Sequence, residues 1–75
     1  MPSIVIYTPR LTLAQKSATV AAVTEAFARG TGIDAEHLVI HIEEHPYGNV
    51  GVGGKLLTEI YPELAERDRQ AGLDP

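Results

Sequence analysis

The sequence predicts an α+β fold, in which a βαβ protomer with two parallel strands is followed by a small hairpin and a C-terminal helix. Two apolar runs, residues 4–7 and 38–42, have the character of buried β-strands, and a helical pattern lies between them. Because strand, helix and strand together take only about 40 residues, the strands should be parallel and joined by a right-handed crossover. We expect residues 1–75 to form one domain.

The helix between the strands has clear start and stop signals. Thr12 followed by Gln15 is a capping-box pattern, in which the hydroxyl accepts from a first-turn N–H and the amide reaches back to the cap. Gly30 suits the left-handed conformation that ends such a helix. Asp34 is placed to cap one further short turn before the second strand begins near Leu38.

The segment after the second strand is rich in glycine. Residues 46–49 (PYGN) predict a turn, and residues 48–54 (GNVGVGG) contain too many glycines for an ordinary strand. Two structures fit this composition: a short hairpin, or extended backbone packed closely against another surface such as a ligand-pocket wall. A phosphate-binding loop fits poorly, because the segment has no lysine and matches neither nucleotide-binding spacing.

Residues 55–75 predict a second helical element. The residue before a proline is disfavoured from helical geometry, so the helix proper should start at Pro62. Glu63 and Arg67 are spaced as an i,i+4 ion pair, and Gly72 resembles a helix stop.

Composition excludes several classes of partner. The net charge is −4 with only six lysines and arginines, which argues against a nucleic-acid surface. No apolar run approaches the roughly 20 residues of a membrane span, and the start lacks the features of a signal peptide. There are no cysteines, which suits a reducing, cytoplasmic location and rules out disulfides as a source of stability.

Both predicted strands are apolar on both faces, and such strands need cover on both sides. The helix between them is sufficient to cover one face of the sheet. Either the C-terminal segment or another copy of the protein must cover the other, and we favour another copy. A homo-oligomer would also compensate for the small core of a 75-residue chain.

The string HIEEH, from His41 to His45, matches the H-x-x-E-H pattern of some zinc hydrolases. That chemistry needs both histidines on one helical face. Here the string continues a strand, in which side chains four residues apart lie about 13 Å from each other, too far to share one ion. Solvated or interface histidines are the better interpretation, and no metal is expected.

Pro2 stands at the head of the first strand, where a residue without an N–H is tolerated, so an ordinary strand start is one interpretation. Chemistry offers another, because removal of Met1 would make Pro2 a free secondary amine. An α-amino group titrates near about 7.7–8.0, and apolar surroundings or nearby cations lower its pKa. Such a base could remove a carbon-bound proton. Arg10, just past the strand, could lower that pKa and bind a substrate carboxylate.

In combination these features resemble the tautomerase superfamily, specifically the small 4-oxalocrotonate tautomerase type. The resemblance spans residues 2–57 and rests on the order and spacing of several features. They are MP before a short apolar strand, Arg10 in the following loop, Gln15 and Lys16 opening the helix, a second strand near residue 40, and GVGG at residues 51–54.

The resemblance implies a β-α-β protomer that pairs through its sheet, assembled as a hexamer (a trimer of dimers) or as a dimer. It also implies a cofactor-independent isomerase whose amino-terminal proline, Pro2, acts as base and then acid on a small 2-oxo or enol acid. Arg10 corresponds to the family's first-loop arginine. The family's second-strand arginine falls at Val39, and its pocket aromatic falls at Val50. His41, on the same strand face as Val39, is a substitute donor.

Other functions stay open at this point. The superfamily includes dehalogenases and decarboxylases in which a proline ammonium acts as acid, and the absence of the second arginine is compatible with them. A non-catalytic oligomer that binds a small ligand or partner on the same scaffold is an alternative of a different class.

Overall fold

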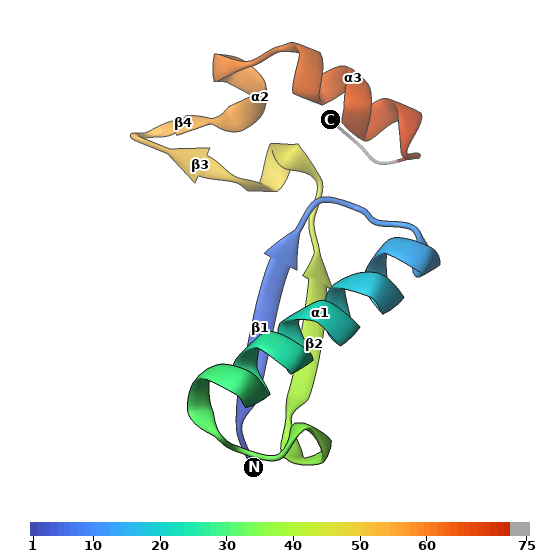
Figure 1. Cartoon of the computed structure of the whole chain (residues 1–75). Helices are drawn as coiled ribbons and strands as arrows, with labels where there is room; N and C mark the ends of the chain where they lie inside the picture. The colour runs from blue at the N-terminus through green and yellow to red at the C-terminus, as the bar shows by residue number, and fades with distance from the viewer. Residues whose placement is uncertain (73–75) are drawn as a thin grey trace. The chain divides into compact units, whose positions relative to one another are not determined.

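The chain runs through two strands and a long helix into a hairpin and two shorter helices (Figure 1). In this computed structural model, which describes residues 1–72, the elements are β1 (Ser3–Thr8), α1 (Leu13–Thr31), β2 (Val39–Glu44), β3 (Gly51–Val52), β4 (Lys55–Leu56), α2 (Leu57–Ile60) and α3 (Glu63–Gln70), with 3₁₀ turns at Ala35–His37 and Tyr47–Asn49. The described residues form two compact units, one of residues 1–7 and 11–43, the other of residues 8–10 and 44–72.

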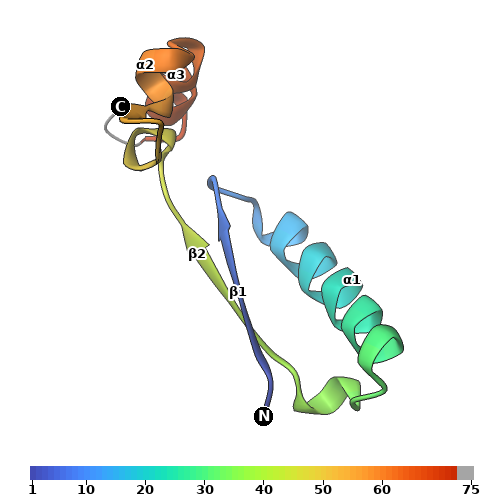
Figure 2. The ribbon, with the colours of Figure 1, turned by 90° about the vertical axis from the view of Figure 1, so that its left-hand side faces the viewer.

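The N-terminal unit is built on the pairing of β1 with β2. The two strands run parallel, and the peptide N–H of Val39 donates to the carbonyl of Pro2 at 3.0 Å, so the pairing starts one residue before β1. Helix α1 lies along one face of this sheet, as Figures 1 and 2 both show. The predicted βαβ protomer is confirmed.

Local capping determines where α1 begins and ends. The hydroxyl of Thr12 accepts from the Gln15 N–H at 3.1 Å, and Gln15 Oε1 accepts from the Thr12 N–H at 2.8 Å, as the capping box predicted. The prediction that Gly30 ends the helix is wrong, because α1 continues to Thr31 and the left-handed residue is Gly32, with φ of 77°. The predicted cap at Asp34 is confirmed by its carboxylate, which accepts from the Glu36 N–H at 3.2 Å.

Strand β1 alternates between covered and open positions. Ile4 and Ile6 are partly buried, whereas Val5 and Tyr7 are 47% and 74% exposed. In residues 1–72 no apolar side chain is fully buried. One face of the sheet is therefore covered by α1, and the other presents apolar and aromatic surface to solvent.

In the C-terminal unit, β3 and β4 form the hairpin that was one of the two structures predicted for the glycine-rich segment. Gly51 pairs with Leu56, and Val52 pairs with Lys55. The two turn residues, Gly53 and Gly54, have φ of 61° and 88°. A two-residue turn with both φ values positive matches the twist of the flanking strands, and glycine adopts it without steric cost.

The second helical element is divided by Pro62, as predicted. Tyr61 is non-helical, with φ of −126° and ψ of 85°, and α3 follows with Pro62 at its N-cap. The predicted pair of Glu63 with Arg67 is not among the ion pairs of residues 1–72. Of the helices in that range, none combines the length and the apolar character needed to cross a membrane.

Candidate active site

Pro2 lies at the head of β1, where the backbone holds it in place. Its carbonyl accepts the Val39 N–H at 3.0 Å, and the residue is partly buried. Met1 in front of it is 88% exposed. The main-chain bond to β2 restrains the direction of the Pro2 nitrogen, because the ring leaves few backbone conformations open. An amine released here by loss of Met1 would have a defined orientation.

Val39 and His41 lie beside this position on β2. Successive side chains of a strand point to opposite faces, so Val39 and His41, two residues apart, share one face of the sheet. The side chain of His41 is exposed and able to donate a hydrogen bond to a ligand. No group of three histidine, cysteine or acidic side chains within residues 1–72 is arranged to hold a metal ion.

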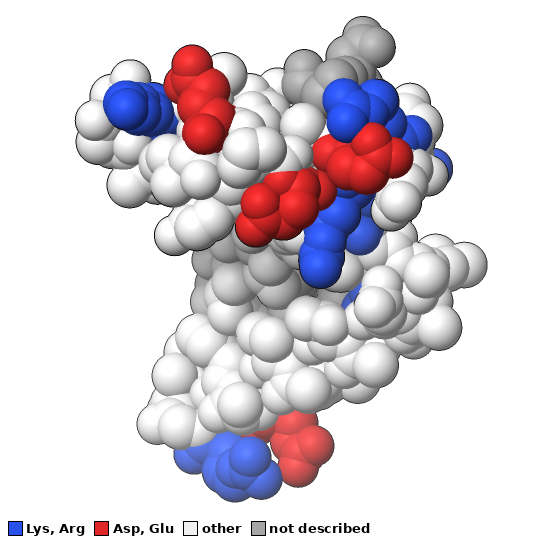
Figure 3. Space-filling view, turned by 90° about the horizontal axis from the view of Figure 1, so that it is seen from above, with Lys and Arg blue, Asp and Glu red and all other residues white. Residues whose placement is uncertain are grey.

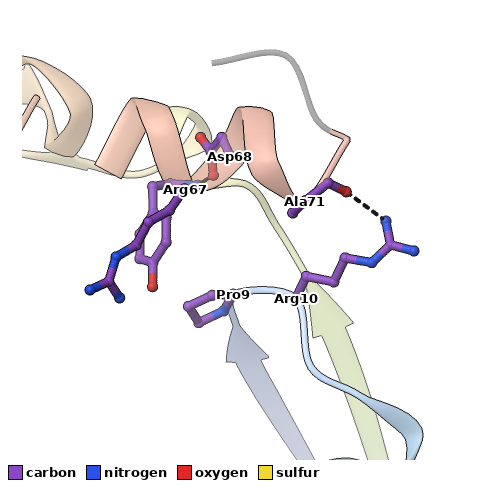
Figure 4. A pocket seen from close by; sticks show the side chains of 6 residues that line it. Pro9, Arg10, Arg67, Asp68 and Ala71 are labelled. Carbon is purple, nitrogen blue, oxygen red and sulfur yellow. Dashed lines mark hydrogen bonds between the residues drawn. The ribbon is translucent and has the colours of Figure 1, made fainter. Parts of the chain in front are cut away.

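Arg10 follows β1 and lines a pocket in the C-terminal unit (Figure 4). Its Nη1 donates to the carbonyl of Ala71 at the end of α3, at 3.3 Å. A cation is favourable at a helix C-terminus, so this contact also stabilises α3. The pocket has a volume of about 210 Å³ and is lined by Pro9, Arg10, Tyr47, Arg67, Asp68 and Ala71.

Asp68 is a residue that the sequence analysis did not single out. It is 2% exposed, and among residues 1–72 it is the one polar side chain that is fully buried. Its carboxylate oxygens accept main-chain N–H groups of Tyr47 at 2.8 Å and Gly48 at 2.9 Å. Asp68 thus ties α3 to the 3₁₀ turn that leads toward β3. The run of charges around it in the sequence is typical of a solvated helix and gave no signal of this role.

Val50 connects that turn to the hairpin. Its N–H donates to the Tyr47 carbonyl at 3.2 Å, and its own carbonyl accepts from the Leu57 N–H at 2.8 Å. Its side chain is 39% exposed, which leaves apolar surface available to a ligand. The backbone around Val50 is fixed on both sides, so this surface has a defined position within the C-terminal unit.

The predicted site residues fall into two groups. Pro2, Val39 and His41 belong to the N-terminal unit, whereas Arg10 and Val50 belong to the C-terminal unit. Pro2 precedes β1 and Arg10 follows it, and a strand of six residues is about 20 Å long.

A βαβ protomer with a proline at residue 2 and a short glycine hairpin defines a small class of proteins. A family model described as tautomerase enzyme matches residues 2–60, and the chain belongs to this family. A search of curated proteins finds no match.

Three solved structures illustrate the similarity. DmpI from Archaeoglobus fulgidus is 38% identical, with a TM-score of 0.70 over 76% of this chain and 98% of its own. YwhB, a homologue of 4-oxalocrotonate tautomerase, is 34% identical, with a TM-score of 0.71 over 77% of this chain and 97% of its own. A 4-oxalocrotonate tautomerase isozyme from Methylibium petroleiphilum is 30% identical, with a TM-score of 0.70 over 80% and 98%.

The matched region has a boundary that matters for the site. It ends at residue 60, before α3, and the three structures are covered almost to their full length. The fold and a tautomerase-type function therefore rest on residues 2–60. Helix α3, with Arg67 and Asp68, lies beyond the match.

Proposed function

We propose that the protein is a cofactor-independent tautomerase that isomerises a small 2-oxo or enol acid with Pro2 as general base and acid. The observation that carries this proposal is the place of Pro2. It directly precedes β1 inside the matched tautomerase region, and a main-chain bond to Val39 fixes its backbone. A secondary amine held there is suited to moving a proton between carbon and oxygen.

The chemistry requires Met1 to be removed, because a Pro2 nitrogen within a peptide bond has no basicity. The free amine takes a proton from the carbon next to the substrate carbonyl, and the electron pair of that C–H bond moves to form the enolate. The resulting prolinium returns the proton to the enolate oxygen or to another carbon of the conjugated system. His41 or a main-chain N–H stabilises the enolate oxygen while the charge is present.

Arg10 binds the substrate carboxylate through its guanidinium group. Because β1 separates Pro2 from Arg10 by about 20 Å, the arginine at each site comes from a neighbouring copy. The open face of the sheet, with Val5 and Tyr7 exposed, supports a homo-oligomer whose second copy covers this apolar surface. Val50 adds an apolar contact to the substrate at the edge of the site.

Blocking the amino terminus tests the proposal without changing any side chain. One preparation has Pro2 as its first residue, verified by intact mass, and a matched preparation keeps an uncleaved extension before Pro2. We expect ketonisation of phenylenolpyruvate, followed by ultraviolet absorbance, only in the first preparation. Equal activity in both would contradict the proposal, because the extended chain has no basic nitrogen at Pro2.

A second function is favoured by one specific feature. The position of the family's second-strand arginine is Val39 here, so one of the groups that polarises a 2-oxo acid is absent. Dehalogenation or decarboxylation with a prolinium as acid is compatible with the absence of that group. Assay of a 3-haloacrylate beside phenylenolpyruvate separates these reactions, and the tautomerase proposal requires turnover of the enol acid.

A further inference from the structure

Helix α3 lies beyond the matched tautomerase region, and side-chain hydrogen bonds connect it to two other segments of the C-terminal unit. In one contact, the Asp68 carboxylate accepts the main-chain N–H groups of Tyr47 at 2.8 Å and Gly48 at 2.9 Å. In the other, the carbonyl of Ala71 accepts from Nη1 of Arg10 at 3.3 Å, as Figure 4 shows. The second contact therefore involves the arginine that the proposed function assigns to the substrate carboxylate.

A main-chain hydrogen bond joins these two contacts. The N–H of Ala71 donates to the carbonyl of Asp68 at 3.2 Å, three residues earlier in the chain. Because this bond fixes the distance between them, a shift of Asp68 carries Ala71 with it. Hydrogen bonds thus run without interruption from the 3₁₀ turn at Tyr47–Asn49, through Asp68 and Ala71, to the guanidinium group of Arg10.

Burial distinguishes Asp68 from the surface charges of α3. Asp68 is 2% exposed, whereas Glu66 and Arg69 pair with each other at 2.6 Å with side chains 56% and 52% exposed. Figure 3 shows acidic and basic side chains against each other on the surface seen from above. A buried carboxylate with a main-chain donor on each oxygen has a better-defined position than such a surface pair. Asp68 is therefore a firm anchor for the end of α3.

We propose that Asp68 is a positioning residue, which fixes α3 so that the Ala71 carbonyl holds the Arg10 guanidinium group ready for the substrate carboxylate. This inference rests on the proposed function, in which Arg10 binds that carboxylate. An arginine that is already ordered loses less rotamer freedom when it binds a ligand. The bond to Ala71 uses one of the five N–H donors of a guanidinium group, so a carboxylate can still accept two.

Steady-state kinetics with phenylenolpyruvate test this role through the KM. Each preparation has Pro2 as its first residue, and circular dichroism verifies that each variant is folded. Asp68→Asn should raise the KM about fivefold and leave kcat within about twofold, because Arg10 must then be ordered by the substrate. In an Arg10→Gln background the same substitution should change the KM less than about twofold, because the side chain that it positions is gone.

A merely structural role for Asp68 predicts a different result. It would reduce the folded fraction, which lowers kcat per mole of protein and leaves the KM unchanged in both backgrounds. Glu66→Gln is the matched control, since Glu66 is an exposed acid on the same helix that pairs with Arg69. This control removes the same charge from α3 and should leave the KM within about twofold of the wild type.

NMR relaxation of the arginine side chains tests the positioning without catalysis. In the wild-type chain, the order parameter of the Arg10 guanidinium N–H groups should exceed that of Arg29, whose side chain is 73% exposed. In Asp68→Asn the value for Arg10 should fall to that of Arg29. The wild-type comparison does not depend on the folding of any variant.

Four results would overturn the assignment: an unchanged KM in Asp68→Asn, an equal rise in the Arg10→Gln background, an equal rise in Glu66→Gln, or a wild-type Arg10 no more ordered than Arg29. Each of these leaves the proposed function standing if a free Pro2 is still required for turnover. Activity with a blocked amino terminus would instead end the proposed function, while Asp68-dependent order of Arg10 would still show that Asp68 positions this side chain.

Discussion

Asp68 provides the sharpest prediction about stability. Its carboxylate is 2% exposed and accepts two main-chain N–H groups, at 2.8 and 2.9 Å. A hydrogen bond to a charged group contributes about 1.5–3 kcal/mol, and a buried N–H left without a partner is costly. Asp68→Asn keeps one acceptor oxygen but directs an NH₂ donor at the other N–H. We therefore expect a loss of about 2–3 kcal/mol in the free energy of unfolding.

Urea unfolding followed by circular dichroism measures this loss, with all variants at one protein concentration because an oligomer's stability depends on it. Amide hydrogen exchange at Tyr47 and Gly48 should become faster in the same variant. Asp34→Asn is the matched control, since Asp34 accepts a single N–H, from Glu36, at an exposed site, and should cost less than about 1 kcal/mol. A loss below about 0.5 kcal/mol in Asp68→Asn, with unchanged exchange at the two amides, would refute the reasoning.

Further predictions concern the substrate, the oligomer and the end of α1. Arg10→Gln should raise the KM of a carboxylate substrate about tenfold with kcat nearly unchanged, as steady-state kinetics will show; an unchanged KM would contradict carboxylate binding by Arg10. Val5→Glu should dissociate the proposed oligomer, seen as a lower molar mass in light scattering, whereas Ala21→Glu on the exposed side of α1 should leave the molar mass unchanged. An unchanged molar mass in Val5→Glu would place the interface elsewhere. Gly32→Ala should lower the free energy of unfolding by about 1 kcal/mol, because alanine is strained at a φ of 77°. Gly30→Ala, inside α1, should raise the free energy of unfolding by about 0.5–1 kcal/mol. If thermal unfolding showed Gly32→Ala to be the more stable variant, the helix boundary would be contradicted.

Features set by neighbouring residues could be predicted from the sequence. The capping box of Thr12 with Gln15 needs only a spacing of three residues. Pro62 restricts the residue before it, whatever the rest of the chain does, and the start of α3 followed. The end of α1 was harder, because Gly30 and Gly32 are both suitable for a left-handed cap. The residues around the two glycines do not indicate which of them takes the left-handed conformation.

Features that depend on distant contacts could not be predicted. The hydrogen bonds of Asp68 cross about 20 residues of sequence, and nothing local marks this acid among the charges of α3. The pairing of charges within α3 is a similar case. The i,i+4 spacing predicted Glu63 with Arg67, whereas the structure pairs Glu66 with Arg69 and leaves Arg67 at the pocket.

The predicted site residues were recognised from their order in the sequence and not from their proximity in space. Pro2 and Arg10 are eight residues apart in the sequence, and both were assigned to the candidate site from their places before and after β1. The six residues of β1 between them are about 20 Å long, and we propose that the arginine comes from a neighbouring copy. A strand's length can be read from the sequence, but the copy of the chain that would contribute Arg10 to the proposed site cannot.

Substitution of Pro2 in a chain that has lost Met1 is the most direct test of the central claim. Alanine leaves a primary amine that can still accept a proton, but its basicity differs and the ring no longer restrains its direction. We expect kcat/KM of Pro2→Ala for phenylenolpyruvate to fall at least about tenfold, equivalent to about 1.4 kcal/mol of transition-state stabilisation. Intact mass must first show that both proteins lack Met1. Full activity in Pro2→Ala would contradict the claim that Pro2 moves the proton.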